Sequence, residues 1–329
     1  MDGARPDHFA VLTQRKMAVI DAVQEATSRL TSIRGKVGGD RFVRRSLLLP
    51  VAVVIALLTT FPFLFSLVLT FTNMRLLASS GLRFVGFENW GRLFADRNFH
   101  IVLRNTLVFV VAGVTLQYVL GLGLALLLNE DIRGRRFFRI SLFLPMMMSP
   151  VAVSYVIGKM LFSESYGPIN DLLSMLGLPL FTWTLSPAKS MAVLVMVDTW
   201  QWTPFFILVL LAGLQSISPE LYEAARVDGA TPRQMFLYIT FPLLMPLCVT
   251  AILIRSLEAF KVLDLVRVVT GGGPGNSTES VTLFAYDIGL KGGDIAYAST
   301  VAYALLITVI ISSVVFLGVA RRITPRTGE

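Results

Sequence analysis

The sequence predicts an all-α integral membrane protein with six transmembrane helices. Of its 329 residues, 54% are hydrophobic and only 15% are charged, whereas a soluble domain usually carries about a quarter charged residues. Six stretches are apolar over the length of about 20 residues that a helix needs to cross a bilayer. A soluble domain would have to bury several such stretches at once, so this alternative is disfavoured.

The predicted spans follow one another through a transmembrane domain at residues 47–320. They are residues 47–71, 101–128, 140–162, 188–214, 241–269 and 295–320. The first is the most uniformly apolar. The fourth and fifth contain ionisable residues, which must face a protein interior or a watery path, because a charge in lipid costs about 2.5 kcal/mol or more.

The distribution of lysine and arginine predicts that both termini are cytoplasmic. Nine of these residues lie in segment 1–46, four in loop 129–139, two in loop 215–240 and three in tail 321–329. The opposite loops hold five, namely Arg75, Arg83, Arg92, Arg97 and Lys291. Cytoplasmic loops are enriched in these residues. The net charge of +8 is therefore explained by topology, and no nucleic-acid partner is expected.

The N-terminal extension 1–46 admits two interpretations. It has no apolar core beside a small-residue cleavage site, so it is not expected to be a cleaved signal peptide. Apolar residues recur at near-helical spacing, at Phe9, Leu12, Ile20, Val23, Leu30 and Ile33. This pattern fits an amphipathic helix that touches a partner or the membrane lipid. A loosely ordered cytoplasmic extension fits it equally well.

Enzyme chemistry finds no support in the residues. The histidines, His8 and His100, lie outside the six predicted spans, so an intramembrane histidine-dependent protease or metal site has no histidine to use. The sequence lacks a G-x-x-x-x-G-K-[ST] phosphate loop, and the glycine-rich run at 271–275 lacks the lysine of that motif. We therefore expect no catalytic residue, metal or cofactor in this chain, and any ATPase must be another chain.

The loop between the fourth and fifth spans predicts a helical elbow. Pro219 can begin a short helix, and Glu223 suits its positive N-terminal half. Gly229 suits the end of that helix. Thr231 can then cap a second helix with Pro232 at its first position. A short polar elbow of this kind is well shaped to insert into a groove on a partner protein.

This loop carries a resemblance to a known family. The triplet Glu223-Ala224-Ala225, Gly229 after three residues, Ile239 and Pro242 resemble the EAA loop of binding-protein-dependent ABC importer permeases, with Phe241 where the pattern usually has Leu. Further matches are Phe84-Val-Gly-Phe-Glu-Asn-Trp90, Trp202-Thr-Pro-Phe205, and Thr270-Gly-Gly-Gly-Pro274 with Thr278. From about residue 47 onward, the chain is similar to the six-span permease of the maltose, trehalose and glycerol-phosphate type importers.

The resemblance implies a type I ABC importer permease fold in a bacterial inner membrane, and a division of labour among subunits. The elbow would dock on an ATPase subunit through Glu223, Ala224, Ala225, Asp228, Gly229 and Ala230. The implied partners are a second permease subunit, two ATPase subunits that bind ATP and Mg, and an extracytoplasmic solute-binding protein. The implied small-molecule solute is a sugar or a related polyol or glycoside.

The fourth span carries the first candidates for the substrate path, and in maltose-type relatives the residues just before its proline line the solute site. The candidates are Asp198, Trp200, Gln201, Trp202 and Phe205. Pro204 frees a backbone carbonyl, and aromatic faces beside a few polar groups suit a sugar. Alternatively, Trp200 and Trp202 belong to an interfacial aromatic belt or to core packing.

The fifth span carries charges of alternating sign at every third residue. They are Arg255, Glu258, Lys261, Asp264 and Arg267. On one helix, neighbouring members of such a row can meet. We expect structural pairing, with Arg255 bound to Glu258, in preference to direct solute contact. Because these two lie nearest the middle of the membrane, they are also candidates for the substrate path.

Two other classes of function remain open at this point. A secondary transporter of a small polar solute would work without an ATPase, through its buried carboxylates, and would not need the elbow. A membrane scaffold that transports nothing would not need Asp198 or Glu258 inside its spans.

Overall fold

The structure, a computed structural model, is built of helices and describes residues 24–25, 27, 40–76, 81–131 and 133–323. The chain divides into two units, Met1–Phe65 and Ser66–Glu329. Most of the predicted N-terminal extension, and the last six residues of the predicted C-terminal tail, lie outside the described residues.

Helix α2 (Asp40–Leu69) contains the first predicted span and begins before it. Every described side chain from Leu48 to Phe65 is exposed, and most of them are apolar. A helix satisfies its own backbone hydrogen bonds, so apolar side chains around its whole circumference suit lipid. This part of α2 therefore has the apolar surface of a membrane-spanning helix.

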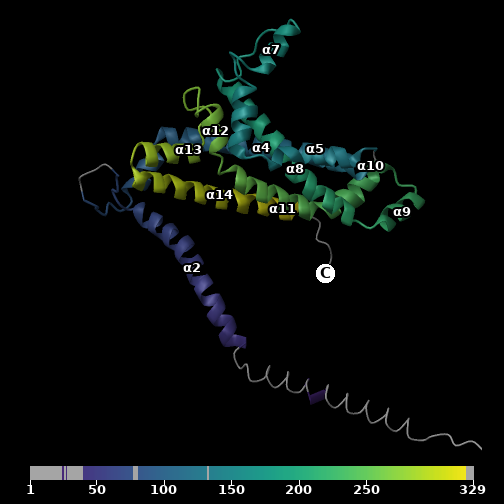
Figure 1. The fold of residues 1–329 in the computed structure, drawn as a ribbon, viewed down its shortest axis with the longest axis horizontal. Coiled ribbons are helices and arrows are strands. Elements are labelled where there is room, and N and C mark those ends of the chain that lie inside the picture. The colour runs from purple at the N-terminus through teal and green to yellow at the C-terminus, as the bar shows by residue number, and fades with distance from the viewer. Residues whose placement is uncertain (1–23, 26, 28–39, 77–80, 132, 324–329) are drawn as a thin grey trace, which may run out of the picture. The chain divides into compact units, whose positions relative to one another are not determined.

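The second unit contains the helices that follow α2. In chain order they are α3 (Glu88–Ala95), α4 (Arg97–Asn129), α5 (Arg135–Met147), α6 (Pro150–Val153), the π-helical turn η1 (Ser154–Met160), α7 (Pro168–Met175), α8 (Pro187–Ser216), α9 (Pro219–Val227), α10 (Pro232–Met235), the π-helical turn η2 (Phe236–Thr240), α11 (Phe241–Ala259), α12 (Asp264–Val269), α13 (Val281–Tyr286), the π-helical turn η3 (Asp287–Lys291) and α14 (Ile295–Ile323). The long helices α4, α8, α11 and α14 lie alongside one another (Figure 1).

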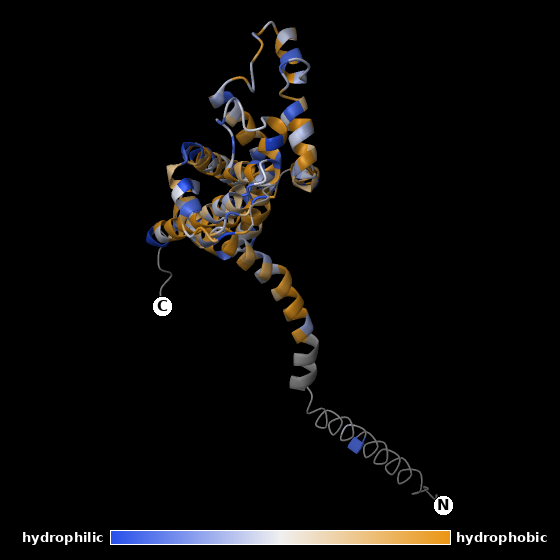
Figure 2. Ribbon diagram, turned by 90° about the vertical axis from the view of Figure 1, so that its left-hand side faces the viewer, coloured by the Kyte–Doolittle hydropathy of each residue, from blue (hydrophilic) through white to orange (hydrophobic). Residues whose placement is uncertain are grey.

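Five helical segments of the described chain are long and apolar enough to cross a membrane. They are the Leu48–Leu69 part of α2, α4, α8, the run Pro232–Ala259, and Ile295–Arg322 of α14. Hydrophobic residues cover these helices over most of their length (Figure 2). A sixth span exists if α5 and the helix Pro150–Met160 are counted together.

The third predicted span, residues 140–162, is not one straight helix. Its two parts, Arg135–Met147 and Pro150–Met160, are bent by 96°. Proline has no N–H group and disfavours helical geometry in the preceding residue. Ser149 accordingly has a ψ of 135°, and Pro150 begins the second part. The bend also frees the carbonyl of Met148, which accepts a hydrogen bond from Gln201 Nε2 at 3.4 Å.

The fifth predicted span, residues 241–269, ends earlier than expected. Helix α11 stops at Ala259, and α12 begins only at Asp264. Side chains from the α13 region satisfy two carbonyls at this break, because Ser280 donates to the carbonyl of Val262 at 2.8 Å and Thr282 donates to that of Phe260 at 3.4 Å. The prediction that one helix carries all five charges of residues 255–267 is therefore wrong.

The main hydrophobic core lies between α4, α8 and α11. It includes Val110 and Val114 of α4, Leu194 and Phe206 of α8, and Ala251 of α11, all of them buried. Helix α8 is the most enclosed of the long helices, since 67% of its most apolar stretch is buried, against 33% for α4. Polar side chains on α8 therefore have to find partners within the protein.

Candidate functional site

The predicted elbow is present between α8 and α11. Pro219 occupies the first turn of α9, and Glu220 is an acidic residue of the same turn. Gly229 has a φ of +76°, a conformation that costs an L-residue with a Cβ atom roughly 1–2 kcal/mol. A Cβ atom at this position would meet no neighbour within 4 Å. The requirement for glycine is therefore one of backbone conformation alone.

Helix α9 ends in a Schellman motif, which places the glycine. The N–H of Ala230 donates to the carbonyl of Ala225 at 2.9 Å, and the N–H of Gly229 donates to that of Arg226 at 3.1 Å. This pair of bonds satisfies carbonyls that a helix end otherwise leaves without partners. The backbone carbonyls of Ala225 and Arg226 thereby help to close the turn.

The second arm of the elbow starts with a capping box. Thr231 Oγ1 accepts from the N–H of Gln234 at 3.4 Å, and Gln234 Oε1 accepts from the N–H of Thr231 at 2.8 Å. Pro232 stands at the first position of α10. The predicted cap and proline are confirmed, and the reciprocal bond from Gln234 adds to them.

The elbow leaves a broad free surface. No residue of α9 is buried, and Val227 is 88% exposed. Among the predicted coupling residues, Glu223, Ala224, Asp228 and Gly229 are exposed, and Ala225 and Ala230 are half-buried. One anchor ties α9 to the next span, because the hydroxyls of Tyr222 and Thr240 lie 2.9 Å apart. The elbow occupies the end of the bundle opposite α13 (Figure 1).

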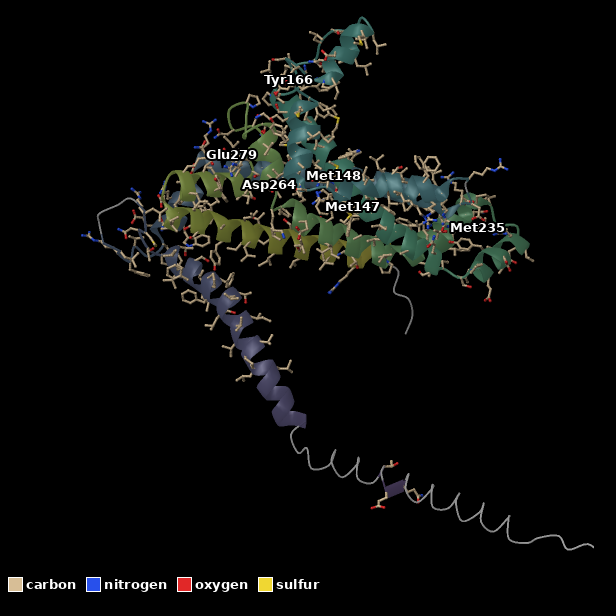
Figure 3. All side chains as sticks on the ribbon, in the orientation of Figure 1. Met147, Met148, Tyr166, Met235, Asp264 and Glu279 are labelled. Carbon is tan, nitrogen blue, oxygen red and sulfur yellow. The ribbon has the colours of Figure 1, made fainter. Side chains whose placement is uncertain are left out.

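A polar pocket of about 220 Å³ lies near the break between α11 and α12. Its polar and aromatic lining residues are Ser154, Asp198, Gln201, Trp202, Arg255, Glu258, Lys261 and Asp264. They come from η1, α8, α11, the break between α11 and α12, and the start of α12, and Asp264 is labelled in Figure 3. Five of the seven predicted substrate-path residues therefore line one pocket: Asp198, Gln201, Trp202, Arg255 and Glu258.

A buried ion pair forms part of the wall of this pocket. Arg255 Nη2 lies 2.5 Å from Asp198 Oδ2, with side-chain exposures of 3% and 7%. Gln117 of α4 contacts both partners, since its Nε2 donates to Asp198 Oδ2 at 2.7 Å and its Oε1 accepts from Arg255 Nε at 2.9 Å. The Arg255 guanidinium also lies over the Trp202 ring, 4.8 Å from its centroid. Three helices thus meet in one polar network.

The prediction that Arg255 binds Glu258 is wrong. Arg255 pairs with Asp198 of α8, and Glu258 pairs with Lys261 at 2.7 Å. Both members of the second pair are more than half exposed in this chain. Of the two fifth-span residues expected to bind each other, one is therefore part of a buried network and the other of an exposed pair.

Two residues predicted for the substrate path do not line this pocket. Trp200 is 41% exposed and lines a separate apolar groove of about 400 Å³ formed by α4, α5 and α8. Phe205 is half-buried and packs edge-to-face against Phe206, with ring centroids 5.5 Å apart. Trp200 and Trp202 are two residues apart, and a helix turns such neighbours to different faces. Trp202 therefore lines the polar pocket, whereas Trp200 lies in the apolar groove and is too exposed for core packing.

Gln117 is the residue of this network that the sequence prediction missed. It is completely buried. A lone glutamine in a mostly apolar transmembrane stretch is a signal in itself, because its amide must find partners inside the protein. The sequence does not give the rotational orientation of α4 about its axis, however, so it does not say which residues those partners are.

The glycine-rich loop closes on itself at the other end of the bundle. The Thr278 hydroxyl donates to the carbonyl of Gly273 at 2.7 Å, and the Thr278 N–H donates to that of Gly272 at 3.0 Å. Glu279 follows, half-buried. The pKa of Glu279 is raised from 4.5 to about 7, mainly by burial of the carboxyl group and also by the negative charge of Asp287, while Lys291 opposes the shift.

Comparisons with known proteins agree on the family. Residues 117–329 match the model of the family described as binding-protein-dependent transport system inner membrane component. The trehalose/maltose transport system permease protein MalF of Thermococcus litoralis is 37% identical over 72% of this chain and 80% of its own length. The sulfoquinovosyl glycerol transport system permease protein SmoG of Agrobacterium fabrum is 33% identical over 86% of this chain and 92% of its own.

A solved structure supports the fold. It is a chain of a bacterial alginate ABC transporter in complex with an alginate pentasaccharide-bound periplasmic protein, with a TM-score of 0.76 and 24% identity over 90% of this chain and 99% of the other. The elbow and the membrane-spanning helices are consistent with this family match. This chain belongs to the family of binding-protein-dependent transport system inner membrane components, the permeases of ABC importers.

Proposed function

We propose that this chain is a permease subunit that forms half of the translocation path of an ATP-driven sugar importer. The polar pocket beside Asp198 and Arg255 supplies the solute contacts of this subunit. The elbow around Gly229 couples the path to a separate ATPase. Relatives named for trehalose/maltose and for multiple sugars, at 37% and 33% identity, support a carbohydrate as the solute.

The observation that carries the proposal is the exposed elbow. A two-armed turn with a Schellman stop, a capping box and no buried residue on its first helix has a defined shape without being packed into its own chain. A loop that served only to connect two spans would need none of these features. Such a surface suits insertion into a groove of an ATPase subunit. Because the elbow connects α8 to α11, a movement of the ATPase subunit would be passed to both helices.

The proposal implies a larger assembly. A second permease subunit completes the path, two ATPase subunits bind ATP and Mg, and an extracytoplasmic binding protein delivers the solute. The elbow and both termini then face the cytoplasm, as the lysine and arginine distribution predicts. The polar pocket opens at the helix break, and backbone that leaves helical geometry inside a membrane is tolerated where it lines a cavity.

Reconstitution in lipid vesicles tests the proposal. Uptake of a radiolabelled disaccharide such as trehalose or maltose should require ATP, the ATPase subunits and the binding protein together. A vesicle with the permeases alone and an imposed proton or sodium gradient is the control. Gradient-driven uptake without ATPase subunits would overturn the proposal and favour a secondary transporter.

A further inference from the structure

The Arg255–Asp198 pair keeps two polar atoms without partners. Asp198 Oδ2 accepts from both Arg255 Nη2 and Gln117 Nε2, and Arg255 Nε donates to Gln117 Oε1. Within the described part of the chain, Asp198 Oδ1 and Arg255 Nη1 have no hydrogen-bond partner. The pair therefore retains one strong acceptor and one strong donor.

Neither of these two atoms is fully enclosed by the described residues, and both belong to residues of the polar pocket. The ring of Trp202, also in the lining, lies against the guanidinium. The wall thus presents an N–H donor, a carboxylate acceptor and an aromatic face together.

The charge balance of the pocket decides which solute fits this wall. Arg255 is neutralised by Asp198, and Lys261 by Glu258, which leaves Asp264 as a lining carboxylate outside both pairs. An acidic solute would meet a net negative wall and would compete with Asp198 for Arg255. A neutral hydroxyl accepts from Nη1 without that competition, and a neighbouring hydroxyl donates to Oδ1.

Gln117 fixes this geometry from outside the pocket lining. Its amide binds Nε of the guanidinium and Oδ2 of the carboxylate, which leaves Nη1 of Arg255 and Oδ1 of Asp198 for other partners. Helix α4 approaches closely here, because a Cβ atom on Gly113 would lie 3.3 Å from Asp198 Oδ2 and 3.6 Å from Gln117 Nε2. Small changes at either position should therefore move the pair.

We propose that Gln117 positions the Arg255–Asp198 pair to bind two adjacent hydroxyls of the solute. The pocket then selects an uncharged polyhydroxyl solute over a carboxylated or sulfonated one. This inference rests on the proposed transport function and names the charge class of its solute.

Equilibrium binding to the purified complex of permeases and ATPases in lipid nanodiscs tests the inference. The probes are radiolabelled maltose and trehalose, and a disaccharide with one uronate ring. Wild-type complex should bind at least one uncharged probe roughly tenfold or more tightly than the uronate. Gln117→Met should weaken that binding roughly tenfold, whereas Thr250→Val, an exposed site of α11 outside the pocket lining, should not change it.

Charge variants separate binding from folding. Asp198→Asn leaves Arg255 without its counter-ion, so this variant should bind the uronate better than wild type does. The exchange Gln117→Glu with Asp198→Asn returns a carboxylate to Arg255. It should recover the melting temperature that Asp198→Asn loses, while affinity for the uncharged probe stays reduced, because an amide now faces the pocket.

Several results would overturn the inference. They are tighter binding of the uronate than of both uncharged probes, no binding of either uncharged probe, or wild-type affinity in Gln117→Met. If Gln117→Met does not assemble, Gly113→Ala replaces it. This variant displaces its neighbours by a few tenths of an ångström and should weaken binding severalfold; unchanged affinity would refute the positioning role. If any of these binding results is found and ATP-dependent uptake still occurs, only the further inference is refuted and the proposed transport function is retained.

Discussion

Arg255 of α11 and Asp198 of α8 form a buried ion pair across 57 residues of sequence, with Nη2 and Oδ2 2.5 Å apart. Removing two charges from water costs several kcal/mol per ion, and attraction between them offsets this only when further hydrogen bonds satisfy both groups. Gln117 supplies one such bond to each of them. The pair is therefore a site at which the loss of one partner has a large effect.

A double-mutant cycle measures that effect. Arg255→Met or Asp198→Leu alone strands a buried charge, and each should destabilise the complex by about 3–5 kcal/mol. The double variant should recover part of the loss, because no unpaired charge remains. The measurement is the melting temperature of the purified complex for all four members. Additive losses would show that the two side chains do not depend on each other.

The exposed pair Glu258–Lys261 is the matched control for that cycle. Its side chains are 52% and 61% exposed, and exposed pairs contribute about 0–1 kcal/mol. Lys261→Met should therefore lower the melting temperature far less than Arg255→Met. An equal loss at both sites would mean that burial does not govern the difference.

Position 229 should tolerate other residues according to how readily each adopts the left-handed backbone conformation that Gly229 has. Gly229→Asn should keep part of the ATP-driven uptake, and Gly229→Val should abolish it, because a β-branched residue is strained at a φ of +76°. Uptake in vesicles and the amount of membrane-inserted chain are measured together. Gly123→Ala, a helical site with open space around it, should transport normally. Full transport by Gly229→Val would refute the coupling role of the elbow.

The two neighbouring tryptophans of α8 should separate in function. Trp202→Ala removes an aromatic face from the polar pocket and should reduce sugar-stimulated ATP hydrolysis by the assembled complex. Trp200→Ala alters the apolar groove and should preserve that stimulation. ATPase assays with and without binding protein and sugar provide the comparison, and the reverse result would move the solute path to the groove.

Glu279 should make stability depend on pH. Its pKa of about 7 exceeds the ordinary value of 4.5, so the folded state binds a proton that the unfolded state releases between these values. Stability should therefore fall as pH rises from 4.5 to about 7 and change little above that. Glu279→Gln keeps the side chain neutral and should raise the melting temperature above pH 7 but not below 4.5. If the melting temperatures of the two proteins differed by the same amount at every pH, the raised pKa of Glu279 would be contradicted.

The elbow is the part of the site that local sequence specifies well. A proline at a helix start, a glycine in the left-handed region and a threonine cap act through the backbone within a few residues. Pro219, Gly229 and Thr231 therefore predicted the turn that the structure shows. The bonds from Ala230 and Gln234 follow from that same geometry.

The membrane-spanning character was likewise determined by the sequence alone. Partition into lipid depends on the composition of each stretch of about 20 residues, whatever its neighbours. The predicted second, fourth and sixth spans correspond to α4, α8 and α14 for this reason. The break after Ala259 depends instead on groups from another part of the chain, because Ser280 and Thr282 donate hydrogen bonds to the freed carbonyls. At the bend beside Ser149, Pro150 is a local cause, but the donor to the freed Met148 carbonyl is Gln201 of α8.

Only the tertiary structure decided which polar side chains meet. Arg255 has Glu258 one turn away on its own helix, yet the packing of α8 and α4 against α11 brings Asp198 and Gln117 to it instead. The same packing turns Trp202 toward the polar pocket and Trp200 toward the apolar groove. Composition determines that a charged or aromatic residue in a span needs a partner, but the rotation and approach of whole helices determine which partner it finds.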